Sequence, residues 1–178
     1  MTAIYHALCA CLGLSPSSEE ASVLIREAYQ EPENAPRPPR NTDVVYYSAE
    51  PDRAGNEPPA AYANENPGAA SHVPAVSGFA AYTMVVVCYG PNAETNARKI
   101  RAFLYMDGNG YPRSILRKAG LYPVPDPPEE MVLHEPEGGL WRSRADVVIS
   151  LRVKETLFHN NRRNAITVAP AIVVHAGE

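Results

Sequence analysis

The sequence is short of the patterns that mark secreted and membrane proteins. It has three cysteines, Cys9, Cys11 and Cys88, which is an odd number without the spacing of a disulfide framework. We therefore expect a reduced, intracellular setting. No apolar run approaches the roughly 18 to 20 residues of a membrane span. The N-terminus also lacks the basic start and small-residue cleavage site of a signal peptide, so no membrane partner is expected.

Basic charge is also in short supply. The chain carries 16 Lys and Arg against 20 Asp and Glu, which gives a net charge of −4 and a pI near 5.7. A protein that wraps DNA needs a strong basic patch, because its affinity comes from neutralising phosphates. The composition argues against such a protein, although not against one that DNA merely passes.

Signatures of catalysis and metal binding are missing. The sequence has no Gly-x-Ser-x-Gly elbow, His-Glu-x-x-His, Walker-type loop or dinucleotide fingerprint. Cys9 and Cys11 would point apart on a helix, which favours packing over metal binding. Residues 107–110 begin like a calcium loop, but Pro112 and Lys118 stand where the loop requires glycine and glutamate. We expect neither a metal nor a cofactor.

Proline, in contrast, is abundant, with 18 residues that must lie mainly in loops. Residues 49–78 combine prolines with Ala, Asn, Glu and Gly and carry few large aliphatic side chains, too few to offset the ordering entropy. We expect this segment to be an extended or disordered insertion in a single domain of residues 1–178, or to become ordered on another subunit. Residues 121–128 form a second proline-rich stretch, either a surface strap or a ligand for a partner's aromatic groove, with Tyr122, Pro123 and Pro125 as candidate contacts.

The clearest structural signal is a strand that turns sharply into a helix. Residues 84–89 are apolar and uncharged, which predicts a strand covered on both faces. Gly90 and Pro91 end it, and Asn92 is a favourable N-cap. An apolar stripe then follows at helical spacing, formed by Ala93, Ala97, Ile100 and Leu104.

The other segments build a sheet around this unit. Patterning predicts two further helices, at residues 2–12 and 112–118. It predicts strands at residues 43–47, 131–134, 145–153 and 165–174, a turn at 135–139, and a strand or alternatively a helix at 21–30. The strands at 145–154 and 165–174 are expected to form an antiparallel hairpin. The fold class is thus α/β, with a mixed, largely antiparallel sheet flanked by helices.

One enzymatic alternative stays open. Free amides at a helix N-terminus can hold an anion, so the turn from Gly90 to Asn92 is a candidate anion site. The pairs Glu129 with Glu130 and Glu135 with Glu137 would be catalytic only if folding brought a pair into a pocket.

Three stretches carry a resemblance to a known family. They are Val-Cys-Tyr-Gly-Pro-Asn-Ala at 87–93, the run at 111–128, and Leu-Trp-Arg-Ser-Arg-Ala-Asp at 140–146. In order and spacing, residues 82–175 resemble the neck or tail terminator proteins of long-tailed bacteriophages and prophages. The resemblance implies a structural protein of the virion neck, assembled in the host cytoplasm as a hexameric ring. Such a ring caps the tail tube, faces the head connector and lets DNA pass, with a sheath terminal ring as a further partner; a connector-side neck or head-completion protein is the alternative.

Several charged residues are candidates for the interface of such a ring. An exposed hairpin can add its edges to a neighbour's sheet. Basic groups near it can pair with acidic groups across the interface. The candidates are Arg142, Arg144 and Asp146, together with Arg162, Arg163 and Asn164 in the expected turn at 158–164.

Overall fold

The computed structural model describes residues 2–28, 39–52, 61–63, 75–106 and 110–158. Its helices are α1 (Thr2–Leu12), α2 (Glu19–Leu24), α3 (Ala93–Tyr105) and α4 (Tyr111–Lys118). Its strands are β1 (Ile25–Glu27), β2 (Val44–Pro51), β3 (Ala61–Ala63), β4 (Ala75–Tyr89), β5 (Leu121–Pro123), β6 (Glu130–Glu137) and β7 (Leu140–Phe158). The expected α/β class is confirmed.

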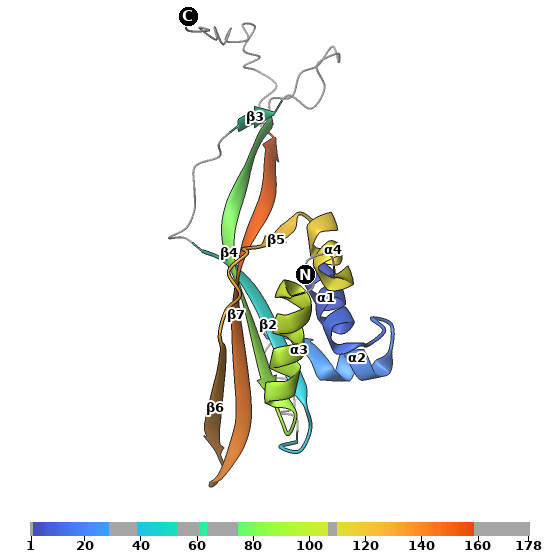
Figure 1. Ribbon diagram of the computed structural model, residues 1–178, viewed down its shortest axis with the longest axis vertical. Coiled ribbons are helices and arrows are strands. Elements are labelled where there is room, and N and C mark those ends of the chain that lie inside the picture. Colours follow the sequence, from blue (N-terminus) through green and yellow to red (C-terminus); the bar gives the residue numbers. More distant parts are fainter. Residues whose placement is uncertain (1, 29–38, 53–60, 64–74, 107–109, 159–178) are drawn as a thin grey trace, which may run out of the picture.

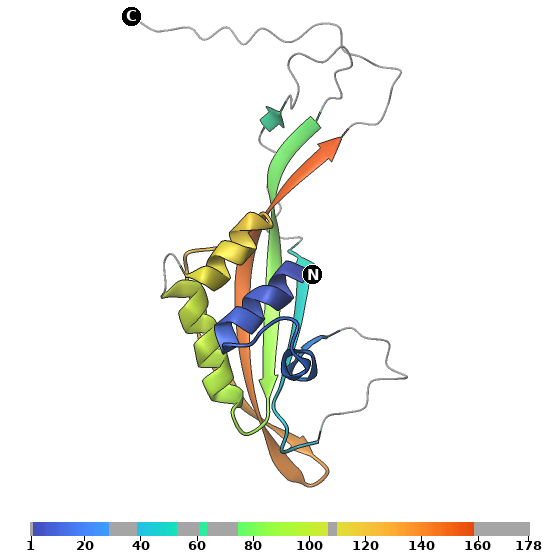
Figure 2. The ribbon, with the colours of Figure 1, turned by 90° about the vertical axis from the view of Figure 1, so that its right-hand side faces the viewer.

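The strands form one mixed sheet with the order β1-β2-β4-β7-β5, in which β3 also pairs with β4 and β6 with β7. The pairing of β1 with β2 is parallel, and the other pairings are antiparallel. The helices lie together on one face of the sheet (Figures 1 and 2). Strands β4 and β7 extend together past the helical layer at one end, and β7 with β6 projects past it at the other (Figure 1).

Burial alternates along the central strands because helices cover only one face. Ile149 and Leu151 of β7 are buried while Val148 and Ser150 are exposed, as the alternating pattern predicts. On β4, the buried residues are Met84, Val86 and Cys88, whereas those between them, Val85, Val87 and Tyr89, are only half-buried. The prediction that residues 84–89 are covered on both faces was therefore wrong within the subunit.

The apolar stripe of α3 packs on the covered face, as predicted. Its four members, Ala93, Ala97, Ile100 and Leu104, are all fully buried. Helix α1 packs against the same layer, and the Cys11 thiol lies 4.0 Å from the carbonyl oxygen of Ile100. Burying a side chain such as Ile100 or Leu104 stabilises the fold by about 1.5–3 kcal/mol, so this stripe anchors the helix to the sheet.

The expected hairpin between residues 145–154 and 165–174 is corrected by the strand order. One edge of β7 pairs with β4 along its length. The other edge pairs with β6 and with β5, which leaves no room beside residues 145–147 and 151–153. Residues 165–174 themselves lie outside the described residues. Adjacency in sequence favoured a hairpin with the segment after β7, whereas β7 instead pairs with the preceding β6 on one edge and with the distant β4 on the other.

Other boundaries also differ from expectation. Residues 21–30 contain the end of α2 followed by β1, so both alternatives hold for part of the segment. Within 49–78, the end of β2, all of β3 and the start of β4 are strands, and residues 53–60 and 64–74 lie outside the described residues. The turn expected at 135–139 is confined to Gly138 and Gly139, because β6 continues to Glu137. No helix in the described ranges combines the length and apolarity that a membrane crossing requires.

The buried cysteines predict a loss of stability at alkaline pH. Burial raises the pKa of the Cys11 and Cys88 thiols from 9.0 to about 12. The folded state therefore favours the protonated thiols, and this stabilisation is complete below pH 9.0 and disappears as the pH rises toward about 12. At that pH the loss is up to about 4 kcal/mol per thiol. Urea unfolding at a series of pH values should show this decline, and Cys88→Ala should make it shallower; an equal decline in both proteins would contradict the assignment.

Candidate assembly surface

Five side chains from three strands meet on the face of the sheet that the helices leave uncovered. Tyr89 ends β4, Glu135 lies on β6, and Arg142, Arg144 and Asp146 lie on β7. The strand register sets Tyr89 opposite Arg144 and Glu135 opposite Arg142. We call this group the Tyr89 cluster.

The contacts within the Tyr89 cluster are close and polar. The Arg144 guanidinium donates from Nε and Nη2 to the two carboxylate oxygens of Asp146, each at 2.8 Å. Its Nη1 lies 3.6 Å from Glu135 Oε2, which accepts a 2.9 Å hydrogen bond from the Tyr89 hydroxyl. The Arg142 guanidinium lies over the Tyr89 ring, 4.7 Å from its centroid.

These contacts keep the charges of the cluster inside the subunit. The hydrogen bonds to Asp146 raise the pKa of Arg144, so the Arg144 guanidinium keeps its charge. Burial, followed by the hydrogen bond to Glu135, raises the pKa of Tyr89. Arg142, Arg144 and Asp146 were expected to face acidic groups of another subunit. The structure shows that Arg144 and Asp146 pair with each other within β7. Glu135 of β6 contacts both Arg144 of β7 and Tyr89 at the end of β4, which links the three strands.

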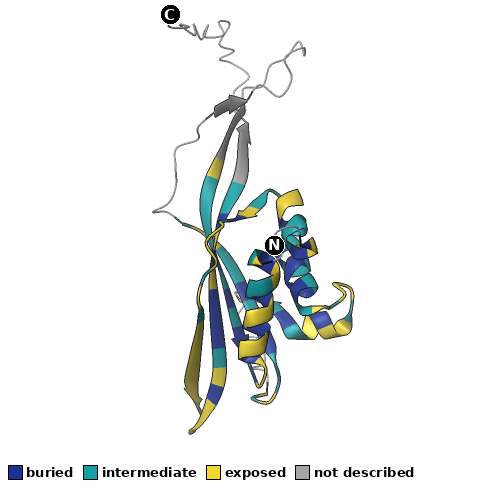
Figure 3. Ribbon diagram, viewed as in Figure 1, coloured by how far each residue is buried: buried dark blue, intermediate teal, exposed yellow. Residues whose placement is uncertain are grey.

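β6 and the start of β7 form a hairpin whose tip projects past the helical layer (Figures 1 and 3). We call residues 130–144 the hairpin arm. Gly138 and Gly139, with φ of 58° and 80°, form the two-residue turn at its tip. Next to this turn, Leu140 is 63% exposed and Trp141 is 70% exposed. The arm's other exposed apolar residues are Met131, Val132 and Leu133.

Each face of the hairpin arm carries exposed apolar side chains among charged and polar ones. Strand alternation places Leu133 and Leu140 on the uncovered face of the sheet and Val132 and Trp141 on the helix side. The helices end before the tip, so both sets meet solvent (Figure 3). Exposed apolar side chains gathered at a hairpin tip are typical of surfaces that contact another protein.

The proline-rich strap supplies fewer exposed contacts than expected. Pro123 is buried where β5 pairs with β7, while Tyr122 and Pro125 are exposed. The Tyr122 ring meets Phe79 of β4 edge to face, with centroids 5.7 Å apart. Tyr122 and Phe79 thus add an aromatic pair to the uncovered face of the sheet. Arg162, Arg163 and Asn164 lie outside the described residues.

The candidate anion site is already occupied by a carboxylate of the same chain. The backbone N–H of Asn92 donates to Asp43 Oδ1 at 2.9 Å, and its side-chain amide donates to Asp43 Oδ2 at 2.7 Å. Asn92 is the N-cap of α3 as predicted, but its own side chain makes no capping hydrogen bond to the helix. Asp43 therefore supplies the negative charge that the helix N-terminus favours.

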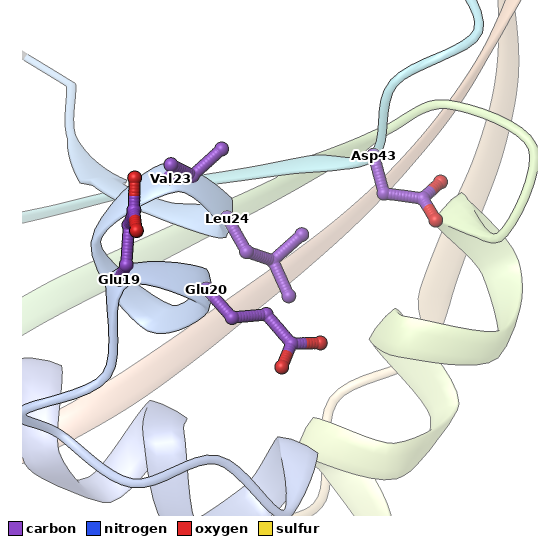
Figure 4. Close-up of a pocket in the computed structure, with 5 residues that line it drawn as sticks. All are labelled: Glu19, Glu20, Val23, Leu24 and Asp43. Atoms are coloured by element: carbon purple, nitrogen blue, oxygen red, sulfur yellow. The ribbon is translucent and has the colours of Figure 1, made fainter.

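The carboxylate pairs considered for catalysis have other partners. Glu130 accepts a 2.9 Å hydrogen bond from Arg98, and Glu135 belongs to the Tyr89 cluster. A shallow hollow lies elsewhere, between α2 and the start of β2, and is lined by Glu19, Glu20, Val23, Leu24 and Asp43 (Figure 4). The Asp43 carboxylate points toward the start of α3 rather than into the hollow (Figure 4). Among the described residues, no group of three His, Cys, Asp or Glu side chains is placed to hold a metal ion.

The hairpin arm is the feature that the sequence prediction missed. Its signal was present, since two adjacent glycines separate β6 from β7 and the exposed Leu140 and Trp141 follow directly. The hydrogen bond between Tyr89 and Glu135 joins residues distant in sequence and has no local signal. No protein-family model matches the sequence, and no curated protein matches it significantly.

Proposed function

We propose that the protein is a structural component of a phage neck, a tail terminator whose subunits form a hexameric ring on the end of the tail tube. The observation that supports this most is the hairpin arm, which exposes Leu140 and Trp141 and projects beyond the helices. An isolated subunit leaves these side chains in water, whereas a ring or a ring stacked on a tube buries them.

The location of the resembling stretches also supports this function. Residues 87–93 and 140–146 are separated by almost fifty positions, yet they pair side by side in the sheet, with Val87 opposite Asp146 and Tyr89 opposite Arg144. Together they supply Tyr89, Arg142, Arg144 and Asp146 to the Tyr89 cluster. The stretches that resemble terminator proteins thus hold the hairpin arm in a fixed direction, as a presented contact surface requires.

The ring has several partners in this proposal. Copies of the chain contact one another laterally, and the ring's two faces contact the tail tube protein and the head-tail connector or neck proteins, with a sheath terminal ring as a further contact. The acidic net charge of −4 lets DNA pass through the lumen without binding tightly. The protein resides in the virion neck after assembly in the host cytoplasm.

The alternative of a connector-side neck protein uses the same surfaces and differs in the ring that it touches. Isolated tails and DNA-filled heads, offered separately to the purified protein, distinguish the two. A terminator binds the tails, and a connector-side protein binds the heads.

The mass of the assembly and the length of tails test the proposal. We expect light scattering at high protein concentration to give six times the 19.4 kDa chain mass, or a ring that joins tail tubes. Replacing Arg162 and Arg163 together by Glu should yield a folded monomer and tails of abnormal length, because it reverses the charge of the basic segment expected at the interface.

The matched control reverses two exposed basic residues of α4, Arg117 and Lys118, which changes the net charge equally. Its assembly should remain normal. A wild-type chain that stays monomeric and never binds tubes would refute the terminator function. Normal tails made by the Arg162 and Arg163 double variant would refute only the role of those two residues.

A further inference from the structure

We infer that the outer edge of β6 is a docking site for residues 165–174 of a neighbouring copy, which bind there as an added strand. This inference rests on the proposed ring and names the contact that joins its subunits. It is a heterologous contact, since the docking edge and the donated strand are different parts of the chain, and such contacts close into rings.

The first observation is the state of the β6 edge. Among the described strands, β6 pairs with β7 alone. The tight turn at Gly138 and Gly139 makes Glu137 and Leu140 a hydrogen-bonded pair, and these alternate along the hairpin with non-hydrogen-bonded pairs. The backbone N–H and C=O groups of Val132 and His134 therefore point outward from the edge. An unpaired strand edge of this kind can pair with another chain. Pro136, the next outward-facing position, has no N–H, so the added strand would pair with the part of β6 before it.

The second observation is the chemistry of the occupant. Residues 165–174 read Ala-Ile-Thr-Val-Ala-Pro-Ala-Ile-Val-Val, which are uncharged and rich in β-branched side chains. The segment 159–174 has two arginines and no acidic residue, whereas 129–146 has five carboxylates and two arginines. The two segments are therefore complementary in charge as well as in strand character. Pro170 lacks an N–H but is compatible with a strand at a sheet edge.

The third observation is a distance, which prevents all of residues 165–174 from pairing with β6 of the same chain. β7 ends at Phe158, and β6 begins with Glu130 opposite Val147. These eleven residues of β7 span about 36 Å along the sheet. The seven residues from Phe158 to Ala165 reach at most about 25 Å. β5 also occupies the edge of β7 at residues 151–153, across the direct path. The β6 of another copy is free of both restrictions.

Crosslinking between two single-site variants tests the contact directly. One full-length variant carries Val132→Cys and the other Thr167→Cys, and the two are mixed, allowed to assemble and treated with a short bismaleimide. The native Cys9, Cys11 and Cys88 are buried and remain unlabelled. We expect a crosslinked dimer in the mixture, with mass spectrometry identifying residues 132 and 167. A product joining 132 to 132 would overturn the inference in favour of two paired β6 edges, and absence of any crosslinked dimer in assembled rings would also overturn it.

A backbone variant gives an independent readout. Thr167→Pro removes one strand N–H and should convert rings to monomers, because a proline cannot donate to the added pairing. Circular dichroism should show that these monomers remain folded. The control Thr167→Val keeps strand character and should assemble normally. Rings formed by Thr167→Pro would refute the strand donation while leaving the ring function intact. A wild-type chain that forms no ring would instead refute the proposed function.

Discussion

Ile100→Asp is expected to abolish the folded state. Ile100 is fully buried at the centre of the α3 stripe, between the helix and the sheet. The substitution removes aliphatic packing worth about 2–5 kcal/mol. It also places a carboxylate among apolar side chains that cannot solvate it, which costs several kcal/mol even after relaxation. The sum is comparable with the total stability of a small domain, about 5–15 kcal/mol.

Lys99→Asp is the matched control because it puts the same side chain at the next position of the same helix. Lys99 is exposed, so its substitution should change the free energy of unfolding by less than about 1 kcal/mol. Circular dichroism and urea unfolding of the two variants provide the measurement. A cooperative urea transition of Ile100→Asp with a midpoint close to that of the wild type would show that α3 does not pack on the sheet as described.

Local patterns were sufficient where a segment's own residues determine its structure. The stripe of α3 was predicted because a period of 3.6 residues leaves one apolar face, and burial of Ile100 and Leu104 confirms it. The alternation along β7 likewise identified its covered face. Pro112 lies in the first turn of α4, where a missing N–H has no cost, so this helix was also recognisable.

The sequence could not show which faces other elements cover. Val85 and Val87 are as apolar as Val86, but they lie on the side of β4 that carries no helix. An uninterrupted apolar strand was interpreted as buried on both faces, as in parallel sheets. In this subunit the apolar run instead leaves Val85 and Val87 half-exposed on the face without helices. Another subunit could cover that face.

Strand partners and the role of the charged residues depended on long-range contacts. The cluster of Arg142, Arg144 and Asp146 was recognised from composition, but its pairing was assigned to another subunit. The bidentate hydrogen bonds between Arg144 and Asp146 are made within β7 itself, two residues apart on one face. Alternation in a strand places such residues side by side, so this contact was predictable once the strand was known. Its link to Tyr89 through Glu135 was not.

Gly90→Ala is expected to be the second most damaging of these substitutions. Gly90 has φ of 107°, a conformation that costs a residue with a Cβ about 1–2 kcal/mol in strain. A Cβ there would lie 2.5 Å from Asp43 Oδ1 and 2.8 Å from both the Asp43 Cα and the Thr42 carbonyl oxygen. Two of these three atoms belong to the backbone, so the segment just before β2, which contains Thr42 and Asp43, must move.

The movement also breaks the contact that fixes the start of α3. Asp43 accepts hydrogen bonds from the backbone and side chain of Asn92, and displacing it leaves those donors and the carboxylate without partners, at a cost of about 1–3 kcal/mol. We expect Gly90→Ala to lower the free energy of unfolding by about 2–5 kcal/mol in total. Urea unfolding, with amide exchange at residues 92–94, measures both effects.

Gly13→Ala separates conformational strain from collision. Gly13 also has a positive φ, 75°, but a Cβ there would meet no atom within 4 Å. It should therefore lose only the strain energy, about 1–2 kcal/mol. If Gly90→Ala cost no more than Gly13→Ala, the close approach of Asp43 to Gly90 would be disproved. A larger loss at Gly90, with faster exchange at residues 92–94, would instead show that the Asp43 carboxylate holds this turn at the start of α3.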